Sequence, residues 1–443
     1  MFNRRQMLKS TLKGASLVAL APSVPGFIAS SAEAAAASKD RVLVVLELAG
    51  GNDGLNTVIP YADDLYHKAR PTLRYQKKDI IRVDDTIGLH PALRPMEKLL
   101  QDGHLAIVQG VGYPNPNRSH FESMDIWQSA DPRRKTTSGW LGRSLANISV
   151  AEGGVPAFYV GTERLPLAMQ GPTAGVASLH PAKPFELRLS GREEPEDPFS
   201  AKPSASPNTE KAKPASDPDA ARRQLIRELT SRAESGTADA LQFVRRTSLQ
   251  TLTTIDRLRE IMGNFERPDG TFERRGADFS IVRQGLRYEL RLIAAMIRAG
   301  IGSRIYYVGL DGFDTHSSQA AEHRQLLETV AEGVSTFFRE LAESGDAERV
   351  LLMTFSEFGR RVEENGSEGT DHGSGSCLFV AGPKAKGGLI GKHPSLRPGD
   401  LEDGDLKYHT DFRQVYATLL DRWLEVDSRR VLDGKFEHVG VLK

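Results

Sequence analysis

The chain has 443 residues, of which 39% are hydrophobic and 26% are charged, so it has ample material for a large buried core. Its formal net charge is zero, which gives no electrostatic case for nucleic acid as a main partner. Cys377 is the only cysteine, and this excludes an intramolecular disulfide and thiolate metal clusters. Any metal would therefore be held by carboxylate, imidazole or hydroxyl ligands.

Residues 1–34 are predicted to be an export signal. The run NRRQMLK contains adjacent Arg4 and Arg5, and a weakly apolar stretch follows it and ends in a small-residue cleavage pattern at Ala34. This arrangement resembles the twin-arginine export signal of bacteria. Residues 1–34 hold four basic residues and one acidic residue, so their removal leaves 54 basic and 57 acidic residues.

Export through this pathway implies the twin-arginine translocation machinery as a partner and a periplasmic or secreted protein. An N-terminal membrane anchor is the alternative, but the apolar stretch is short and is interrupted by glycine and proline. No later stretch offers the uninterrupted apolar run of a spanning helix, so we expect no stable membrane span.

Residues 41–48, RVLVVLEL, predict the first buried strand of a parallel sheet. The turn that follows contains Asn52 and Asp53, which supply either oxygen ligands or turn hydrogen bonds. Because open α/β sheets bind ligands beyond the carboxyl ends of their strands, Asp53 is a candidate metal ligand and Asn52 a further candidate. Glu47 lies inside the apolar run, where it needs a polar partner, and is another candidate.

Residues 105–110, LAIVQG, predict a second strand, after which a helix begins near Ser119. A helix N-terminus favours an anion or an ionised hydroxyl, so Ser119 is a candidate nucleophile if a metal or a base lies nearby. Ser119 and Glu122 also have the spacing of a capping box, which requires no catalysis. The local sequence leaves both interpretations open.

Residues 191–220 are rich in Pro, Ser, Lys and Glu, which predicts a flexible surface linker or mobile insertion. Residues 221–300 are predicted to be a helical segment that covers the sheet or forms a cap. The flanking ranges, 40–190 and 301–443, would be the two parts of one α/β domain.

Residues 305–310, IYYVGL, predict a third strand that leads into Asp314 and His316. An acid and an imidazole two positions apart beyond a strand can turn toward one metal ion. The alternative is an Asp-Gly turn followed by an exposed histidine. His323, on the predicted helix 318–343, is a further candidate.

Residues 350–355, VLLMTF, predict a central strand because the run is wholly apolar. Glu357 follows this strand, and a loop then contains Asp371 and His372. Glu357 and His372 are candidate metal ligands, whereas Asp371 is expected to orient its neighbour.

The order of these motifs resembles the alkaline phosphatase and sulfatase superfamily. In detail the chain resembles the twin-arginine-exported family called domain of unknown function 1501. The stretches that carry the resemblance are LAGGNDGLNTVIPY (48–61), 119–127, GFDTH (312–316), FSEFGRR (355–361) and GTDHG (369–373). The resemblance implies an alkaline phosphatase-like three-layer sandwich, with a central mostly parallel sheet and a helical insertion.

The resemblance also implies a metal-dependent hydrolase of phosphate or sulfate esters, whose substrate is a small molecule or a polymer. Ser119 would be the nucleophile. One or two divalent ions, among them Zn, Mg, Mn or Ca, would be held by Asp53, Asp314, His316, Glu357 and His372.

The chain departs from the superfamily pattern in two places. It has Glu357-Phe358 where the superfamily has an Asp-His pair, so one imidazole is missing. The spacing of Asp314 and His316 is tighter than usual, which leaves room for His323 to substitute. The alternative function is therefore a non-catalytic exported binding or cell-envelope assembly protein that keeps the fold.

Overall fold

The computed structural model describes residues 41–148, 155–171, 176–179, 258, 260–261 and 279–443. The predicted export signal, the linker 191–220 and most of the helical segment 221–300 lie outside the described residues. Their boundaries remain predictions.

A nine-stranded sheet forms the centre of the described chain. Five neighbouring strands run parallel to one another, and their order across the sheet is β9 (Val350–Phe355), β1 (Val42–Ala49), β8 (Ile305–Asp311), β6 (Ala157–Val160) and β7 (Val176–Leu179). The run 350–355 therefore lies inside the sheet, between β1 and β10 (Ser376–Ala381), and the predicted central strand is confirmed.

Beyond β9 the sheet continues with one reversed strand. β10 (Ser376–Ala381) pairs antiparallel with β9 and with β5 (Leu105–Gly112). The short strands β11 (Gly388–Ile390) and β12 (Thr410–Asp411) then pair parallel with β5. Because two reversals restore the direction, β5 runs the same way as β9 and β1.

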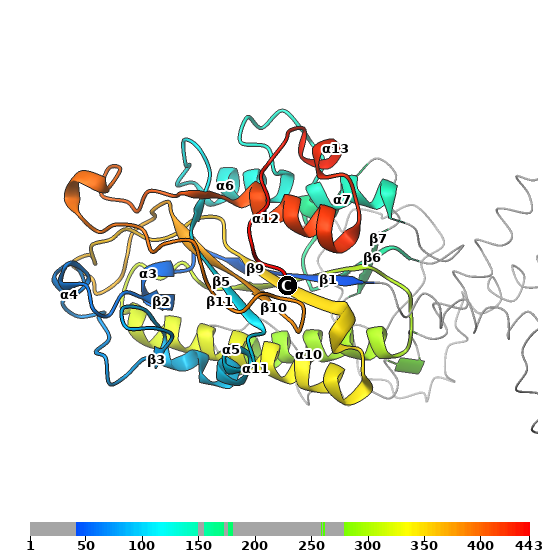
Figure 1. The fold of residues 1–443 in the computed structure, drawn as a ribbon, viewed down its shortest axis with the longest axis horizontal. Helices are drawn as coiled ribbons and strands as arrows, with labels where there is room; N and C mark the ends of the chain where they lie inside the picture. Colours follow the sequence, from blue (N-terminus) through cyan, green and yellow to red (C-terminus); the bar gives the residue numbers. More distant parts are fainter. Residues whose placement is uncertain (1–40, 149–154, 172–175, 180–257, 259, 262–278) are drawn as a thin grey trace, which may run out of the picture.

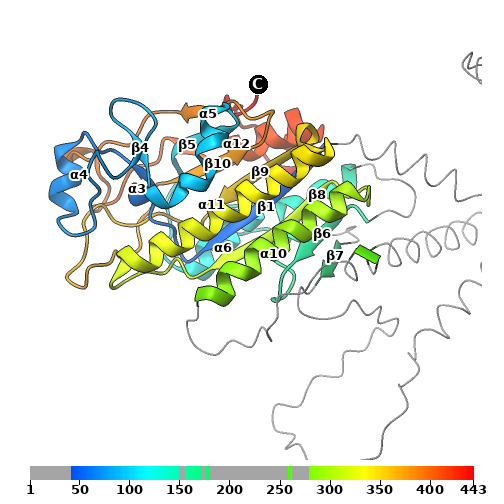
Figure 2. The same cartoon turned by 90° about the horizontal axis from the view of Figure 1, so that it is seen from below.

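Helices cover both faces of this sheet (Figures 1 and 2). The long helices α10 (Phe279–Arg298) and α11 (Gln319–Ser344) pack against each other on one face. The other face carries α6 (His120–Ser129), α7 (Trp140–Ser144), α12 (Phe412–Thr418), a π-helix (Leu419–Leu424) and α13 (Ser428–Leu432). The predicted three-layer sandwich with a mostly parallel sheet is confirmed.

Strand β1 shows why its sequence is apolar almost throughout. Side chains alternate between the two faces of a strand. Val44 and Leu46 pack into the core beneath α10 and α11, whereas Leu43 and Val45 pack into the core beneath α6 and α12. Since both faces are covered, both sets of positions must be apolar.

The chain between β1 and β5 forms a small addition beside the main sheet. It contains a three-stranded sheet in the order β2 (Val58–Ile59), β4 (Gly88–Leu89) and β3 (Ile81–Arg82). Its helices are α3 (Gly54–Thr57), α4 (Asp64–Ala69), the 3-10 helix η2 (Pro91–Met96) and α5 (Glu97–Gln101). The 3-10 helix packs against α11 and continues the helical layer on that face.

Strands β1, β5, β8 and β9 all run the same way, so their carboxyl ends meet at one edge of the sheet. The segments that leave these ends are residues 50–53, 113–119, 312–316 and 356–360. This edge is therefore where the predicted polar residues can meet. Within the described part of the chain, no helix has the length and apolarity needed to cross a membrane.

Candidate metal centre

Four side chains converge at the carboxyl edge of the sheet, and we call them the histidine–aspartate cluster: His120, Asp314, His316 and His372. His120 is the first residue of α6, Asp314 and His316 follow β8, and His372 lies between β9 and β10. The distances from Asp314 Oδ1 to the imidazole Nε2 atoms are 3.0 Å for His316, 3.1 Å for His372 and 3.4 Å for His120.

The second ring nitrogen of each histidine faces a fixed acceptor. His372 Nδ1 lies 2.8 Å from the carbonyl oxygen of Arg118, and His316 Nδ1 lies 3.3 Å from Asp371 Oδ1. His120 Nδ1 lies 2.8 Å from Glu357 Oε1. A carbonyl or a carboxylate only accepts, so a proton on each Nδ1 satisfies these contacts and leaves each Nε2 free to present a lone pair to a cation.

The Nε2 atoms are left in an arrangement that favours a cation. His316 Nε2 and His372 Nε2 are 2.9 Å apart, where two lone pairs repel unless a cation or an extra proton lies between them. His120 Nε2 is buried and has no hydrogen-bond partner within the described residues. Buried polar atoms without partners are rare in folded proteins. These residues therefore fit a bound metal ion.

Asp314 is held in place by Arg360. Arg360 Nη2 donates to Asp314 Oδ1 at 2.7 Å, and the buried guanidinium also donates to the carbonyl oxygens of Gly51, Phe313 and Thr370. Burial raises the pKa of Asp314, but the hydrogen bond and the charge of Arg360 outweigh it and lower the pKa to about 2. The carboxylate is therefore charged and fixed relative to three site loops.

Glu357 lies behind His120 rather than among the Nε2 atoms. It is buried, and Oε1 accepts hydrogen bonds from His120 Nδ1 and from the backbone N–H of Gly50, each at 2.8 Å. Its Oε2 accepts from Ser356 Oγ at 3.1 Å. The hydrogen bond to Glu357, followed by the charges of Glu357 and Asp314, raises the pKa of His120 despite partial burial.

Asp53 is not brought into the cluster. Its buried carboxylate accepts from Arg70 Nη1 at 2.6 Å, from Arg70 Nη2 at 3.2 Å and from Gln319 Nε2 at 2.5 Å. Burial raises its pKa, but the charge and hydrogen bonds of Arg70 outweigh this and lower the pKa to about 2. The ion pair with Arg70 takes up the oxygens that a metal would need.

Asn52 and His323 are also directed toward each other. His323 Nε2 lies 3.0 Å from Asn52 Oδ1, and the hydroxyl of Thr57 donates to the same oxygen at 3.2 Å. Burial lowers the pKa of His323 to about 4, although the charge of Asp53 opposes the shift. The two residues support the first turn, and neither joins the histidine–aspartate cluster.

Glu47 has the polar partners that its position in an apolar run requires. Oε2 accepts from Gln128 Nε2 at 2.8 Å and from the hydroxyl of Tyr307. Burial raises the pKa of Glu47 to about 7, although both hydrogen bonds oppose the shift. This carboxyl group belongs to the contact between the sheet and α6.

Ser119 is the residue at the N-terminal cap of α6, but its side chain makes no capping hydrogen bond. Glu122 instead accepts a hydrogen bond of 2.6 Å from Asn117 Nδ2. The capping-box interpretation is therefore wrong. Ser119 is exposed and directly precedes His120 in the chain.

Phe358 packs against the histidines of the cluster. Its buried ring lies 4.9 Å from the ring of His120 and 4.7 Å from the ring of His372, measured between centroids. Gly51 has φ +77 and lies so close to this ring that a Cβ atom there would collide with it.

Among the described residues, one group with metal-ligand geometry is found, and it contains His120, Asp314 and His372.

The sequence matches the family described as "Protein of unknown function (DUF1501)" over residues 40–436. The chain belongs to this DUF1501 family. The family predicted from the five motifs is confirmed. No curated protein sequence matches the chain significantly.

Solved structures similar to this DUF1501 chain include hydrolases. The PsFucS1 sulfatase from Pseudoalteromonas sp. is 11% identical, with 93% of this chain and 74% of that chain covered and a TM-score of 0.37. The phosphonate monoester hydrolase of Agrobacterium radiobacter is 13% identical, with coverages of 89% and 78% and a TM-score of 0.30. The alkaline phosphatase from the Antarctic bacterium TAB5 is 12% identical, with coverages of 78% and 92% and a TM-score of 0.22. Scores this low carry no argument about the activity of the DUF1501 chain.

His120 is the cluster residue that the sequence reasoning missed. Its neighbour Ser119 was singled out, but a histidine at a helix start has no spacing pattern that marks it as a ligand. The available signal was its position after β5, a strand that ends at the same sheet edge as β1, β8 and β9.

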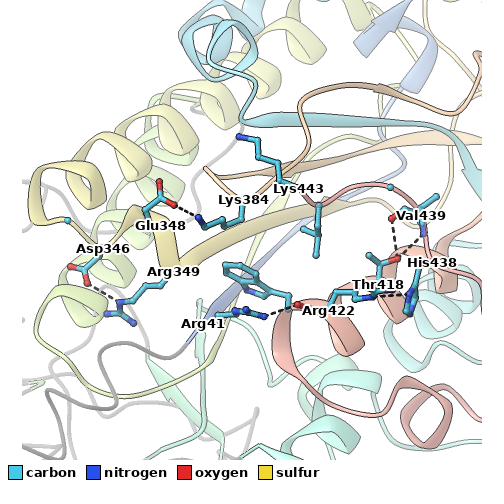
Figure 3. Close-up of a pocket in the computed structure, with 14 residues that line it drawn as sticks. Arg41, Asp346, Glu348, Arg349, Lys384, Thr418, Arg422, His438, Val439 and Lys443 are labelled. Atoms are coloured by element: carbon cyan, nitrogen blue, oxygen red, sulfur yellow. Dashed lines mark hydrogen bonds and ion pairs between the residues drawn. The ribbon is translucent and has the colours of Figure 1, made fainter.

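A separate cavity of about 830 Å³ lies at the opposite edge of the sheet (Figure 3). Arg41 and Arg349, which line it, immediately precede β1 and β9. Arg349 is paired with Asp346 at 2.9 Å, and Lys384 with Glu348 at 2.7 Å. These cations are neutralised locally, and the cavity is far along the strands from the histidine–aspartate cluster.

Proposed function

We propose that the histidine–aspartate cluster binds a divalent cation and that this DUF1501 chain is an exported metal-dependent hydrolase of phosphate or sulfate esters. One observation carries the proposal. Three imidazoles are fixed through Nδ1 and present Nε2 within 3.4 Å of a single carboxylate oxygen. Metal-ligating histidines usually donate their other ring N–H to a carboxylate or carbonyl, as these three do.

The donor set narrows the choice of metal. Three imidazole nitrogens and one carboxylate oxygen suit zinc, and imidazole with carboxylate also accommodates manganese or iron. Magnesium and calcium prefer oxygen ligands throughout. Of the four metals expected from the sequence, zinc and manganese fit these residues best. We assign one ion, held by His120, Asp314, His316 and His372.

The surrounding charges support both a cation and an anionic substrate. The cluster and its immediate neighbours contain four carboxylates and three guanidinium groups. The carboxylates are those of Asp314, Glu357, Asp371 and Asp405, and the guanidinium groups are those of Arg118, Arg360 and Arg361. The carboxylates outnumber the guanidinium groups by one, so a divalent cation would change the net charge of these groups from negative to positive. It would also lower the pKa of a nearby hydroxyl and neutralise charge that develops on phosphoryl or sulfuryl oxygens.

Ser119 is the proposed nucleophile, because the residue is exposed, its side chain is not used for capping and it directly precedes His120 in the chain. In the proposed reaction Ser119 Oγ attacks phosphorus or sulfur, and the ester alcohol leaves with the proton of the serine hydroxyl. Water then hydrolyses the serine ester, which releases inorganic phosphate or sulfate and restores the hydroxyl of Ser119. Glu357 and Asp371 are assigned to orient His120 and His316, since each accepts from an Nδ1 atom. Asp53 is assigned to the ion pair with Arg70.

The alternative is an exported binding or cell-envelope assembly protein without turnover. Phe358 favours it, because the ring occupies the position at which the superfamily pattern has an imidazole, and it packs on two cluster histidines. Export itself is part of the proposal. It would be tested by fusing residues 1–34 to a reporter and replacing Arg4 and Arg5 with lysine, which should stop export.

Metal analysis of the purified chain tests the proposal directly. The wild-type chain should retain about one equivalent of a divalent metal, and His316→Ala should lose it. His67→Ala is the control, because His67 is also half-buried but bonds to the carbonyl of Tyr61 outside the cluster. Activity on p-nitrophenyl phosphate and p-nitrophenyl sulfate should disappear in Ser119→Ala while the metal stays bound. Retention of metal without turnover of any ester would favour the binding protein, and absence of metal would end the metal-dependent hydrolase.

A further inference from the structure

Two arginines flank the histidine–aspartate cluster and share one buried acid. Arg118 donates to Asp405 Oδ2 through Nε at 2.9 Å and through Nη2 at 2.7 Å. On the other side, Arg361 Nε lies 3.6 Å from Asp405 Oδ1. The side chain of Asp405 is 2% exposed, whereas those of Arg118 and Arg361 are 39% and 38% exposed.

Backbone hydrogen bonds connect the main chain of both arginines to the cluster or to its neighbour Asp371. The carbonyl oxygen of Arg118 accepts the hydrogen bond from His372 Nδ1 at 2.8 Å. The backbone N–H of Arg361 donates to the carbonyl of Asp371 at 3.0 Å. Arg118 is followed by Ser119, the proposed nucleophile. The two arginines are therefore tied to residues that hold or neighbour the proposed metal ligands.

Each guanidinium keeps part of its hydrogen-bonding capacity. Arg118 uses Nε and Nη2 for Asp405, and Arg361 uses Nη2 for the carbonyl of Asp403 at 2.8 Å. Within the described part of the chain, neither Nη1 atom makes a hydrogen bond. A guanidinium that is fixed on one side and open on the other can bind an oxyanion through its open edge.

We propose that Arg118 and Arg361, aligned by Asp405, form a subsite for an oxyanion group of the substrate beside the metal centre. This inference rests on the proposed function, because it requires a substrate at the cluster. It narrows the substrate class to esters of phosphate or sulfate that keep a negative charge when bound, and it excludes neutral carboxylic esters as preferred substrates. One carboxylate shared between two arginines leaves one positive charge for the ligand.

The same contacts also allow a purely structural interpretation, in which the arginines only fasten the segment that contains Asp405 to the rest of the fold. The two interpretations differ in the expected affinity of the variants for an oxyanion. A fastening role affects stability without affecting the affinity for an oxyanion, whereas a subsite affects that affinity in a folded chain.

A calorimetric titration of the zinc-loaded full chain with inorganic phosphate distinguishes the subsite from the fastening role. Arg118→Ala and Arg361→Ala should each weaken phosphate binding at least tenfold, because each loses a charge-assisted hydrogen bond. Arg118→Lys keeps the charge and should lose less. Arg291→Ala is the matched control: Arg291 is 47% exposed and bonded at 2.9 Å to Glu340, on the helical layer α10–α11, and its loss should leave phosphate binding unchanged.

Metal content and thermal unfolding are measured on the same samples. If both alanine variants retain zinc and bind phosphate like the wild type, the subsite is wrong while the metal centre stands. An equal loss of affinity in Arg291→Ala, or a wild-type chain that holds zinc but does not bind phosphate, also overturns the subsite. A wild-type chain that cannot hold zinc overturns the proposed function instead. If an alanine variant does not fold, Arg118→Lys and Arg361→Lys decide, because unchanged affinity in both would contradict the proposal.

Discussion

His120 Nδ1 and Glu357 Oε1 lie 2.8 Å apart, although the two residues are separated by 237 positions in the chain. The same carboxylate oxygen accepts the backbone N–H of Gly50 at 2.8 Å. This contact fixes the proton of His120 on Nδ1 and leaves Nε2 directed toward Asp314. It also joins the start of α6, the turn after β1 and the segment after β9 at one buried point.

Replacement of Glu357 should therefore weaken metal binding without touching a ligand. Glu357→Gln keeps an acceptor but loses the charge, and Glu357→Ala loses both, so the affinity for zinc should fall in that order. Loss of such a supporting contact typically costs about 10- to 100-fold in metal affinity. Competition with a chromogenic chelator measures it. Glu364→Gln is the control, since Glu364 accepts from the backbone of Thr72 and Leu73 away from the cluster. An unchanged affinity in both Glu357 variants would contradict the assignment.

The buried pair of Asp53 and Arg70 should affect stability and leave the metal in place. Asp53→Asn leaves the Arg70 guanidinium buried without its counter-charge, and breaking a buried pair in this way costs roughly 3–5 kcal/mol in the free energy of unfolding. Urea denaturation measures the loss. The folded variant should still retain one equivalent of metal. Loss of the metal with little loss of stability would instead make Asp53 a ligand.

The close approach of Gly50 to the segment containing Asp314 gives a sharp steric prediction. Gly50 has φ +114, and a Cβ atom there would lie 2.5 Å from the backbone nitrogen of Asp314. Gly345 has φ +80 at the end of α11, with nothing within 4 Å of such an atom. Gly345→Ala should cost only the backbone strain, about 1 kcal/mol.

Gly50→Ala should lower the free energy of unfolding by more than Gly345→Ala and should also reduce metal affinity, because the backbone of Asp314 must move. Both variants are compared by urea denaturation and metal titration. Equal effects of the two substitutions would show that the close contact between Gly50 and Asp314 contributes neither to the free energy of unfolding nor to metal affinity.

Glu47 should make the stability of the fold depend on pH. Burial raises its folded-state pKa from 4.5 to about 7, so the protonated form is favoured on folding. The resulting stabilisation is complete below about pH 4.5 and is lost as the pH rises through 7. The shift corresponds to about 3 kcal/mol.

Glu47→Gln mimics the protonated form and can still accept hydrogen bonds from Gln128 and Tyr307. The variant should match the wild type near pH 5 and exceed its free energy of unfolding near pH 8. Urea denaturation across this range measures both curves, and parallel curves would contradict the raised pKa.

Local sequence predicted four strands of the nine-stranded sheet. The runs 41–48, 305–310 and 350–355 are apolar because both faces of each strand are covered, and this local property predicted the central sheet. The same reasoning placed Asp314 and His316 beyond a strand end, at the edge where the structure has them. His372 was named from the motif that contains it.

Only the tertiary structure decided which polar residues meet. Asp53 and Glu357 follow strands as closely as Asp314 does. Arg70 nevertheless forms an ion pair with Asp53, and His120 forms a hydrogen bond with Glu357. These partners lie up to 237 positions away, and no spacing rule connects such distant residues. The sequence determined these strands and the edge at which they end, because each buried strand has its own run of apolar residues. Which side chains present a lone pair and which are already paired depends on long-range contacts that form only when the chain folds.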